Sequence, residues 1–381
     1  MKKIYWRPTQ IPRVILLVSV ILAIASISSV ELITVQKKRP YYSRKFQAAL
    51  AMKNGMETIK NYRLKNVSPI DSEFDPADSG MIGLPESPIT SKTGQLAAKQ
   101  HTVNPNWAAV MVEMYKDAGL KKGDTVAMGF SGSFPALNLA AIVAAEALKL
   151  NVLAITSVAA STWGANIPNF TWLDMEHLLY KEDIIKHKSI AASLGGLEDI
   201  ALGKSKKKRA MLSSAIERNG LKPLEFETTS EHIEERMALY WEFAGESRIA
   251  AYVNVGGNLG SIGTKTVKTL FKPGLNKNPP QEVLGVDGVI TRFAREGLPV
   301  INLVYIEKLA KHYGLPESPQ TIPPVGEGQL YRKVAYNLYL TAACLLIMII
   351  VLYAFLRLDI GYRIFGSSRT TQPPKHPEPM V

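Results

Sequence analysis

The sequence predicts an α/β fold, namely a doubly wound, mainly parallel sheet with a helical insertion, flanked by two transmembrane helices. The first observation is a unit of apolar strand, small-residue turn, helix and second apolar strand at residues 125–130, 131–133, 136–149 and 152–157. Such a unit packs its two strands in parallel through a right-handed crossover. The second is that strand and helix patterns alternate again after residue 220, which is typical of helices covering both faces of a sheet. The third is a pair of long uncharged segments near the chain ends.

The uncharged segments divide the 381 residues and their net charge of +12 into five parts. We expect a short basic N-terminus (1–13), a transmembrane helix (14–33), an α/β domain (34–330), a second transmembrane helix (334–356) and a basic, proline-rich tail (357–381). The first segment also has the features of a cleaved signal peptide. An uncleaved anchor is favoured, because Ile24-Ala25-Ser26 is a poor cleavage site and the apolar run continues to Ile33.

Basic residues on either side of the two segments indicate the orientation. They are nearly balanced around the first segment, and after the second segment Arg357, Arg363 and Arg369 favour a cytoplasmic C-terminus. The expected location is therefore the cell (inner) membrane, with two spans and the domain outside the cytoplasm. The single cysteine, Cys344, lies in the second span. Disulfides and thiolate metal sites are thus excluded from the domain.

The elements expected within the domain follow from periodicity and from residues that cap helices. Residues 66–106 are rich in Pro, Ser, Gly and Asp and are expected to be irregular, although part of them should be ordered against the fold. Ser230 is the expected N-cap of a helix. The expected helices are 42–62, 107–118, 231–244, 286–296 and 306–313, with a helical insertion at about 172–219, and the further expected strands are 224–228, 249–255 and 299–304.

Three loops follow expected strands and hold the candidate ligand-binding residues. Ligands of a doubly wound sheet bind beyond the carboxyl ends of its strands. Hydroxyls, amides and backbone N–H groups there suit a carboxylate or a phosphate. The alternative is that Gly and Ser only form tight turns. The candidates are Ser131, Gly132, Ser133 and Asn138 in the first loop and helix, Ser157, Ser161, Thr162, Trp163 and Asn166 in the second, and Asn254, Gly256, Gly257 and Asn258 in the third.

Residues 129–133 nearly match the nucleophile elbow G-x-S-x-G, which makes Ser131 and Ser133 the candidate catalytic residues. Ser133 replaces the last glycine of the motif, and none of His177, His187, His232 and His312 lies in a telling context. A non-enzymatic role is therefore favoured over a serine-dependent hydrolase or transferase. A binding module for a phosphorylated small molecule is a further alternative. Neither a nucleotide-binding glycine loop nor a metal-binding motif is present, so no cofactor, metal or nucleic-acid partner is expected.

Two charged stretches have both a structural and a functional interpretation. The basic run 204–209 is either a solvated helix face or a region that attracts a polyanion. The stretch 170–176 places Asp174 and Glu176 after two aromatic residues, Phe170 and Trp172, and core packing with the two acids at the surface is the favoured interpretation.

Three stretches resemble the PgsW-type family, the bacterial poly-gamma-glutamate system protein: Gly-Phe-Ser-Gly-Ser-Phe-Pro-Ala-Leu-Asn at 129–138, Ser-Val-Ala-Ala-Ser-Thr-Trp-Gly-Ala-Asn at 157–166, and Thr-Trp-Leu-Asp-Met-Glu at 171–176. The likeness extends over about residues 98–304. The resemblance implies a membrane-anchored accessory component of poly-gamma-glutamate biosynthesis and export in capsule formation. Its implied partners are the membrane subunits of the synthase, the anionic polymer and the lipid bilayer. It implies no catalytic residues.

Overall fold

The computed structural model describes residues 13–257, 259–263, 271–278 and 281–357 of the chain. They divide into two units. One unit is the domain, Lys38–Arg332, and the other combines Met1–Lys37 with Lys333–Val381. Each unit is described by itself.

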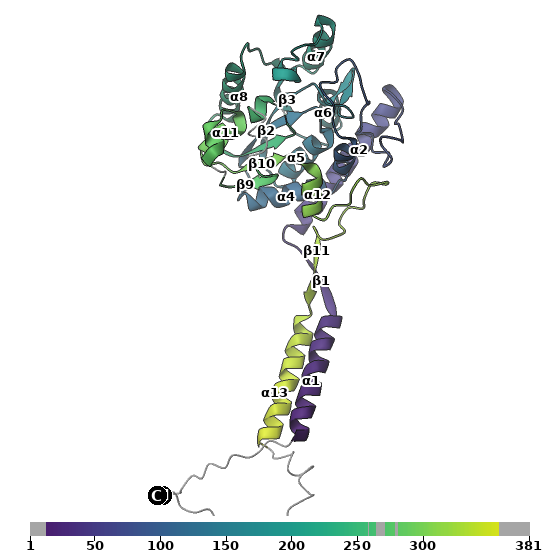
Figure 1. The fold of residues 1–381 in the computed structure, drawn as a ribbon, viewed down its shortest axis with the longest axis vertical. Helices are drawn as coiled ribbons and strands as arrows, with labels where there is room; N and C mark the ends of the chain where they lie inside the picture. The colour runs from purple at the N-terminus through teal and green to yellow at the C-terminus, as the bar shows by residue number, and fades with distance from the viewer. Residues whose placement is uncertain (1–12, 258, 264–270, 279–280, 358–381) are drawn as a thin grey trace, which may run out of the picture. The chain divides into compact units, whose positions relative to one another are not determined.

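The domain is built on a seven-stranded sheet in the order β7-β6-β3-β2-β8-β10-β9. The pairs from β7 to β10 are parallel, and β9 pairs antiparallel with β10 at the edge. From β2 the chain moves outward to β3, β6 and β7, and then returns to β8 on the other side of β2 (Figure 1). The point where the winding reverses lies between β2 and β8. The strands are β2 (Thr125–Ser131), β3 (Asn151–Ser157), β6 (Ser189–Ser193), β7 (Lys222–Pro223), β8 (Ile249–Val255), β9 (Gly274–Asn276) and β10 (Val300–Leu303).

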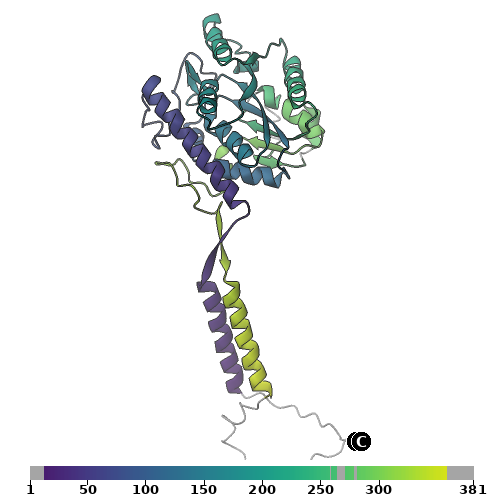
Figure 2. The same ribbon diagram turned by 180° about the vertical axis from the view of Figure 1, so that it is seen from behind.

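Helices cover both faces of this sheet, and the alternation of side chains along the strands explains why. In β2, Val126, Met128 and Phe130 belong to the core beneath α2, α4 and α5, whereas Ala127 belongs to the core beneath α8 and α11. Figure 1 shows α8 and α11 on one side of the strands, and Figure 2 shows α2 from behind on the other. The helices are α2 (Tyr42–Asn66), α3 (Leu96–Thr102), α4 (Trp107–Asp117), α5 (Pro135–Ala147), α6 (Trp172–Lys181), α7 (Lys206–Arg218), α8 (Thr229–Ala244), α9 (Leu259–Ile262), α11 (Val289–Arg295) and α12 (Ile306–His312), with short 3-10 helices at Leu197–Asp199 and Gln281–Gly285.

The α/β fold is confirmed, and the helical insertion at 172–219 is wrong. Between α6 and α7 the chain forms β6, which pairs in parallel with β3 inside the main sheet. The sequence of β6, Ser-Ile-Ala-Ala-Ser, has a single β-branched residue, Ile190, and no aromatic residue. Its neighbours in the sheet therefore determine its conformation.

Smaller differences concern element ends and short elements. Thr228 caps α8 in place of Ser230, since its side chain accepts a hydrogen bond from the Glu231 N–H. The expected strand 224–228 is wrong, because these residues form no strand and the two-residue strand β7 lies directly before them. The expected irregular stretch contains the short helix α3, and β9 and the β4–β5 pair (Asn166–Ile167 and Phe170–Thr171) were not expected.

The chain enters and leaves the domain at neighbouring positions. The backbone N–H of Arg39 donates to the carbonyl oxygen of Tyr331 over 2.8 Å. Lys45, at the start of α2, donates to the carbonyl oxygen of Leu330 and forms an ion pair with Glu113. The first and last segments of the domain are therefore fastened together.

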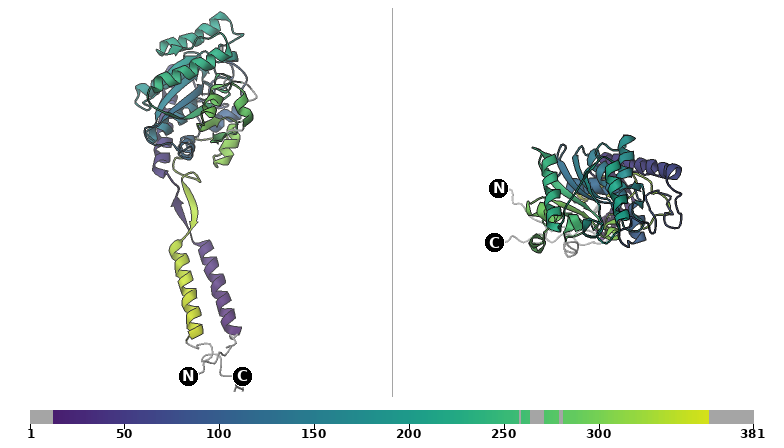
Figure 3. Two further views of the ribbon diagram at one scale, coloured as in Figure 1. Left: turned by 90° about the vertical axis from the view of Figure 1, so that its left-hand side faces the viewer. Right: turned by 90° about the horizontal axis from the view of Figure 1, so that it is seen from above.

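The second unit is a helical hairpin with a short β-ribbon. Helices α1 (Arg13–Leu32) and α13 (Leu338–Arg357) pack side by side, and β1 (Thr34–Lys38) pairs with β11 (Arg332–Tyr336) (Figure 3). Within α13, residues Leu338–Phe355 are long and apolar enough to cross a membrane. Among the described helices only α13 reaches that limit, because the apolar part of α1, Leu16–Leu32, is shorter.

Candidate functional site

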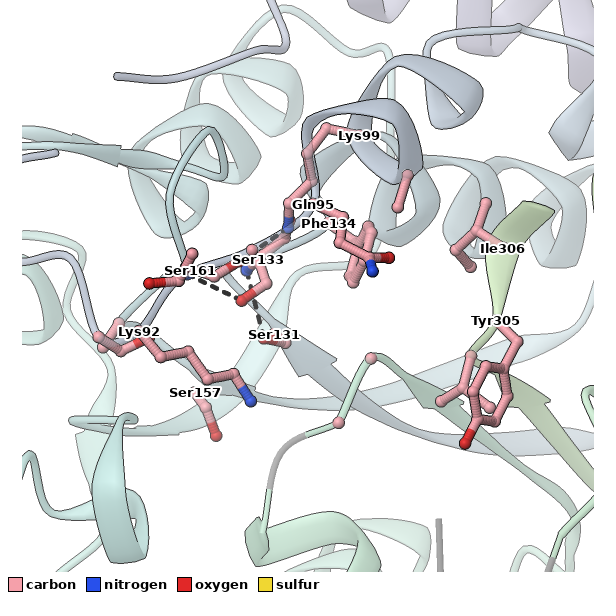
Figure 4. Close-up of a pocket in the computed structure, with 18 of the residues that line it drawn as sticks. Lys92, Gln95, Lys99, Ser131, Ser133, Phe134, Ser157, Ser161, Tyr305 and Ile306 are labelled. Carbon is pink, nitrogen blue, oxygen red and sulfur yellow. Dashed lines mark hydrogen bonds between the residues drawn. The ribbon is translucent and has the colours of Figure 1, made fainter. Parts of the chain in front are cut away.

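A large cavity lies at the carboxyl ends of the central strands, where the winding of the sheet reverses. Its volume is about 1050 Å³. All three predicted loops contribute, with Ser131 and Ser133 after β2, Ser157 and Ser161 after β3, and Gly256 and Gly257 after β8. The rest of the lining comes from Ser91, Lys92, Thr93, Gly94, Gln95, Ala98, Lys99, Phe134, Ala159, Gly196, Leu197, Ile262, Val304, Tyr305, Ile306, Glu307 and Lys308. The expected location of the site at the carboxyl edge is thus where the structure has its large cavity (Figure 4).

The turn from β2 to α5 is packed tightly against the loop after β3. A Cβ on Gly132 would lie 2.3 Å from the carbonyl oxygen of Val158, so only glycine fits. Three N–H groups of the turn are already bonded, because Gly132 donates to Ser157 O, Ser133 to Ser131 Oγ and Phe134 to Ser131 O. The turn therefore offers a ligand its hydroxyls more than its backbone N–H groups, unlike a phosphate-binding loop.

Four of the predicted site residues stabilise the loops through hydrogen bonds, and a fifth lies outside the described residues. Asn138 donates to the carbonyl oxygen of Ser131, and Asn254 donates to Gly256 O and to Asn302 Oδ1. Asn166 accepts from the Leu84 N–H and donates to Leu84 O. Thr162 Oγ1 accepts from the Gly94 N–H, so it connects the loop after β3 to the segment 91–99, which lines the cavity. Asn258 lies outside the described residues.

Trp163 is the remaining predicted site residue, and it is not part of the cavity lining. Its ring packs against Phe74 with centroids 6.0 Å apart. Its backbone has a left-handed φ of 59°, and its N–H donates to Leu84 O. It therefore shapes the loop after β3 from outside.

In the described part of the chain, neither candidate nucleophile of the elbow motif has a His, Asp or Glu side chain as a general base. Ser131 Oγ accepts from the Ser133 N–H, and Ser133 Oγ accepts from the Ser161 N–H. Ser131 does not have the left-handed backbone that a strained elbow would show. Within the described residues, no hydrogen bond joins either serine to a His, Asp or Glu side chain. The elbow interpretation therefore has no geometric support at Ser131 or Ser133.

Among the described residues that line the cavity, Lys99 has the most strongly shifted pKa. It projects from α3 and is only 3% exposed. Its Nζ donates to Ser133 O and lies 2.9 Å from Ser161 Oγ and 3.8 Å from the centroid of the Phe134 ring. Burial, aided by the positive charge of Lys92, lowers the pKa of Lys99 to about 7. Near neutral pH this amine exists in both protonation states.

A buried charged cluster supports the floor of the cavity next to Ser157. Arg236 of α8 is fully buried, and its Nη2 donates to Ser157 Oγ, Ser193 Oγ and Asp199 Oδ2, each at 2.9 Å. Its Nε donates to His232 Nε2 over 2.6 Å. Burial alone would raise the pKa of Asp199, but the charge of Arg236 holds it well below its usual range. The cluster thereby joins α8, β3 and β6 beneath the site.

Some of the left-handed backbone of the domain lies in or next to the cavity lining. Glu198, Asp199 and Ala201 have φ values of 53°, 62° and 54°, directly after Gly196 and Leu197, which line the cavity. Tyr305, on the opposite rim segment, has φ 50°. Such conformations are costly for residues other than glycine and tend to occur at functional sites.

The two charged stretches have separate structural roles. Asp174 forms a capping box with Thr171 and an ion pair with Arg218. Glu176 is buried, so the expectation of surface acids is wrong for it; its carboxylate accepts from the N–H and the hydroxyl of Ser189. Of the basic run, Lys204 donates to Thr90 O, and exposed residues 206–209 begin α7.

Sequence reasoning missed two segments that line the cavity, residues 91–99 and 304–308. The available signal for the first was the length of the irregular stretch 66–106, because so long a loop in a compact domain is normally ordered or functional. Together these segments bring Lys92, Lys99, Glu307 and Lys308 to the cavity. In the described part of the chain, no group of three or more His, Cys, Asp or Glu residues is placed to hold a metal ion.

Fold and site together define a doubly wound α/β domain with a hydroxyl-rich, lysine-bearing cavity at its switch point. No protein-family model matches the chain. No curated protein matches it either, and no solved structure does.

Proposed function

We propose that the chain is a membrane-anchored accessory component of poly-gamma-glutamate biosynthesis and export, which binds the anionic polymer or the synthase. The observation that carries the proposal is the cavity, whose lysines and serine hydroxyls are the groups that bind carboxylates. The resemblance of residues 129–138, 157–166 and 171–176 to the PgsW-type family supports the choice of polymer.

Charge and size of the cavity favour an extended polyanion. Lys92 and Lys308 are exposed on opposite rim segments, and among the described lining residues Glu307 is the one with an acidic side chain. A volume of about 1050 Å³ exceeds what a single amino acid fills and is at the upper end of small-molecule sites. Basic residues 206–209 at the start of α7 would attract the same polymer over longer distances.

The proposed anchor consists of two spans. In addition to α13, we propose α1 as a span. Its side chains Leu17, Ile21, Ile24 and Ile27 are 58–65% exposed. Large apolar side chains exposed in this way require an apolar surrounding. A 20-residue helix such as α1 is about 30 Å long, close to the thickness of the hydrocarbon core. We further propose that the domain lies outside the cytoplasm.

Binding of fluorescent γ-glutamate oligomers to the full-length protein in detergent tests the polymer proposal. Lys92→Ala combined with Lys308→Ala should weaken binding about tenfold or more, because each charged hydrogen bond contributes about 1.5–3 kcal/mol. Lys311→Ala removes an exposed lysine of α12 that does not line the cavity, and it should have no effect.

Two competitors distinguish this ligand from others. Unlabelled γ-linked oligomer should displace the probe at lower concentration than α-linked poly-glutamate of equal length, and inorganic phosphate should not displace it. Equal displacement by phosphate would support the phosphorylated-metabolite alternative. Loss of binding in the Lys311→Ala control, or none in the double variant, would contradict the site.

A further inference from the structure

Lys99 and Ser161 form a contact between an amine and a hydroxyl on the cavity wall. The Lys99 Nζ to Ser161 Oγ distance is 2.9 Å, and both residues line the cavity although each is only 3% exposed. They come from separate parts of the fold, α3 and the loop after β3. Figure 4 shows Lys99 reaching down from its helix toward Ser133 and Ser161.

The surroundings of Lys99 favour the neutral amine. The hydrogen bonds described for Nζ go to two uncharged oxygens, Ser133 O and Ser161 Oγ, and not to a carboxylate. Burial and the nearby charge of Lys92 oppose protonation of Nζ. A lysine that loses its proton near neutral pH can act as a general base.

Gly94 keeps space beside the hydroxyl. A Cβ at this position would lie 2.9 Å from Ser161 Oγ and 3.3 Å from Ser161 Cβ. At position 94, the segment 91–99 therefore approaches Ser161 with its backbone alone. Any side chain at position 94 would crowd the oxygen that has the lysine as its neighbour.

We propose that Ser161 is a nucleophile and Lys99 its general base, for acyl transfer on an amide-linked anionic chain bound in the cavity. This goes beyond the proposed binding function, because it adds a covalent step. Serine–lysine pairs of this kind replace Ser–His–Asp triads in some hydrolases.

The step balances with groups of the protein and water. Lys99 Nζ takes the proton of Ser161 Oγ as that oxygen attacks the carbonyl carbon of an amide. The C–N bond breaks, and the leaving nitrogen takes the proton from Lys99, which yields an ester on Ser161 and a free amine. Water then cleaves the ester with Lys99 again as the base, which restores the serine and releases a carboxylic acid.

The test is covalent labelling of the full-length protein in detergent by an alkyl fluorophosphonate, with the adduct located by peptide mass spectrometry. The reaction forms an Oγ–P bond and expels fluoride. We expect one adduct, on Ser161, whose rate rises about tenfold per pH unit below pH 7 and levels off above it, since only the neutral amine accepts the proton. Ser161→Ala should abolish the adduct, and Lys99→Met should slow labelling about 100-fold or more.

Matched controls separate the pair from general effects. Ser214→Ala removes an exposed serine of α7, and Lys116→Met removes a half-buried lysine that donates to a backbone carbonyl outside the cavity. Both should label at the wild-type rate, and Gly94→Ala should label more slowly. An adduct on Ser131 or Ser133 would overturn the proposal, as would a labelling rate that does not depend on pH. Absence of labelling in the wild type would also overturn it, provided that a cooperative unfolding transition shows the protein to be folded.

Discussion

Lys99 shows how one buried side chain couples protonation to stability. In the unfolded chain its pKa is that of an ordinary lysine, and in the fold it falls to about 7. Between these two values the unfolded state binds more protons than the folded state. The contribution of Lys99 to the free energy of unfolding is therefore lowest below pH 7 and increases as the pH rises above 7.

Lys99→Met should remove this dependence. The free energy of unfolding of the wild type minus that of the variant should become more favourable by up to about 1.4 kcal/mol per pH unit between pH 7 and 9. Urea unfolding of both proteins, followed by tryptophan fluorescence, measures the difference. A flat difference across this range would show that the amine is charged throughout.

Glu176 gives the opposite sign within the same fold. Burial raises its pKa to about 7, although hydrogen bonds from Ser189 act against the shift. Its stabilising contribution is present below the unfolded pKa and is lost as the pH rises through about 7. Glu176→Gln keeps an acceptor for Ser189 and should make the protein more stable than the wild type at pH 8 but not at pH 5. A stability gain that is equal at both pH values would contradict this assignment.

At the scale of elements, the turn between β2 and α5 determines how closely the two central loops approach each other. The sequence predicted the β–turn–α–β unit well, because its strands are apolar and its turn and Pro135 are strong local signals. It predicted β6 poorly, because four of its five residues are Ser or Ala, which have little local preference for a strand. The location of the site followed from the topology, whereas Lys99 lies in a segment with no regular pattern.

Gly132→Ala tests the close approach of these loops. The added methyl group would meet the backbone oxygen of Val158, which cannot move without shifting β3, so we expect a loss of about 1–3 kcal/mol in unfolding free energy. Gly285→Ala is the matched control, since a Cβ there meets nothing within 4 Å. Thermal or urea denaturation measures both, and equal effects would contradict the steric argument.

At the scale of the whole molecule, the proposed location is open to direct measurement because the chain has a single cysteine. Cys344→Ser leaves no thiol, and Lys207→Cys then places one on an exposed position of α7. A membrane-impermeant maleimide should label this cysteine in intact cells with permeabilised outer layers if the domain is extracytoplasmic. Labelling that appears only after the inner membrane is lysed would place the domain in the cytoplasm.

The hydrogen bond between Arg39 and Tyr331 has a consequence for how this protein can change. Because the first and last residues of the domain are neighbours, the whole domain could be replaced by another one without moving the segments on either side of it. New ends could be opened in a surface loop and the old ends closed by a short linker, since adjacent termini tolerate circular permutation. The same arrangement would let a gene acquire or lose the domain in a single insertion or deletion.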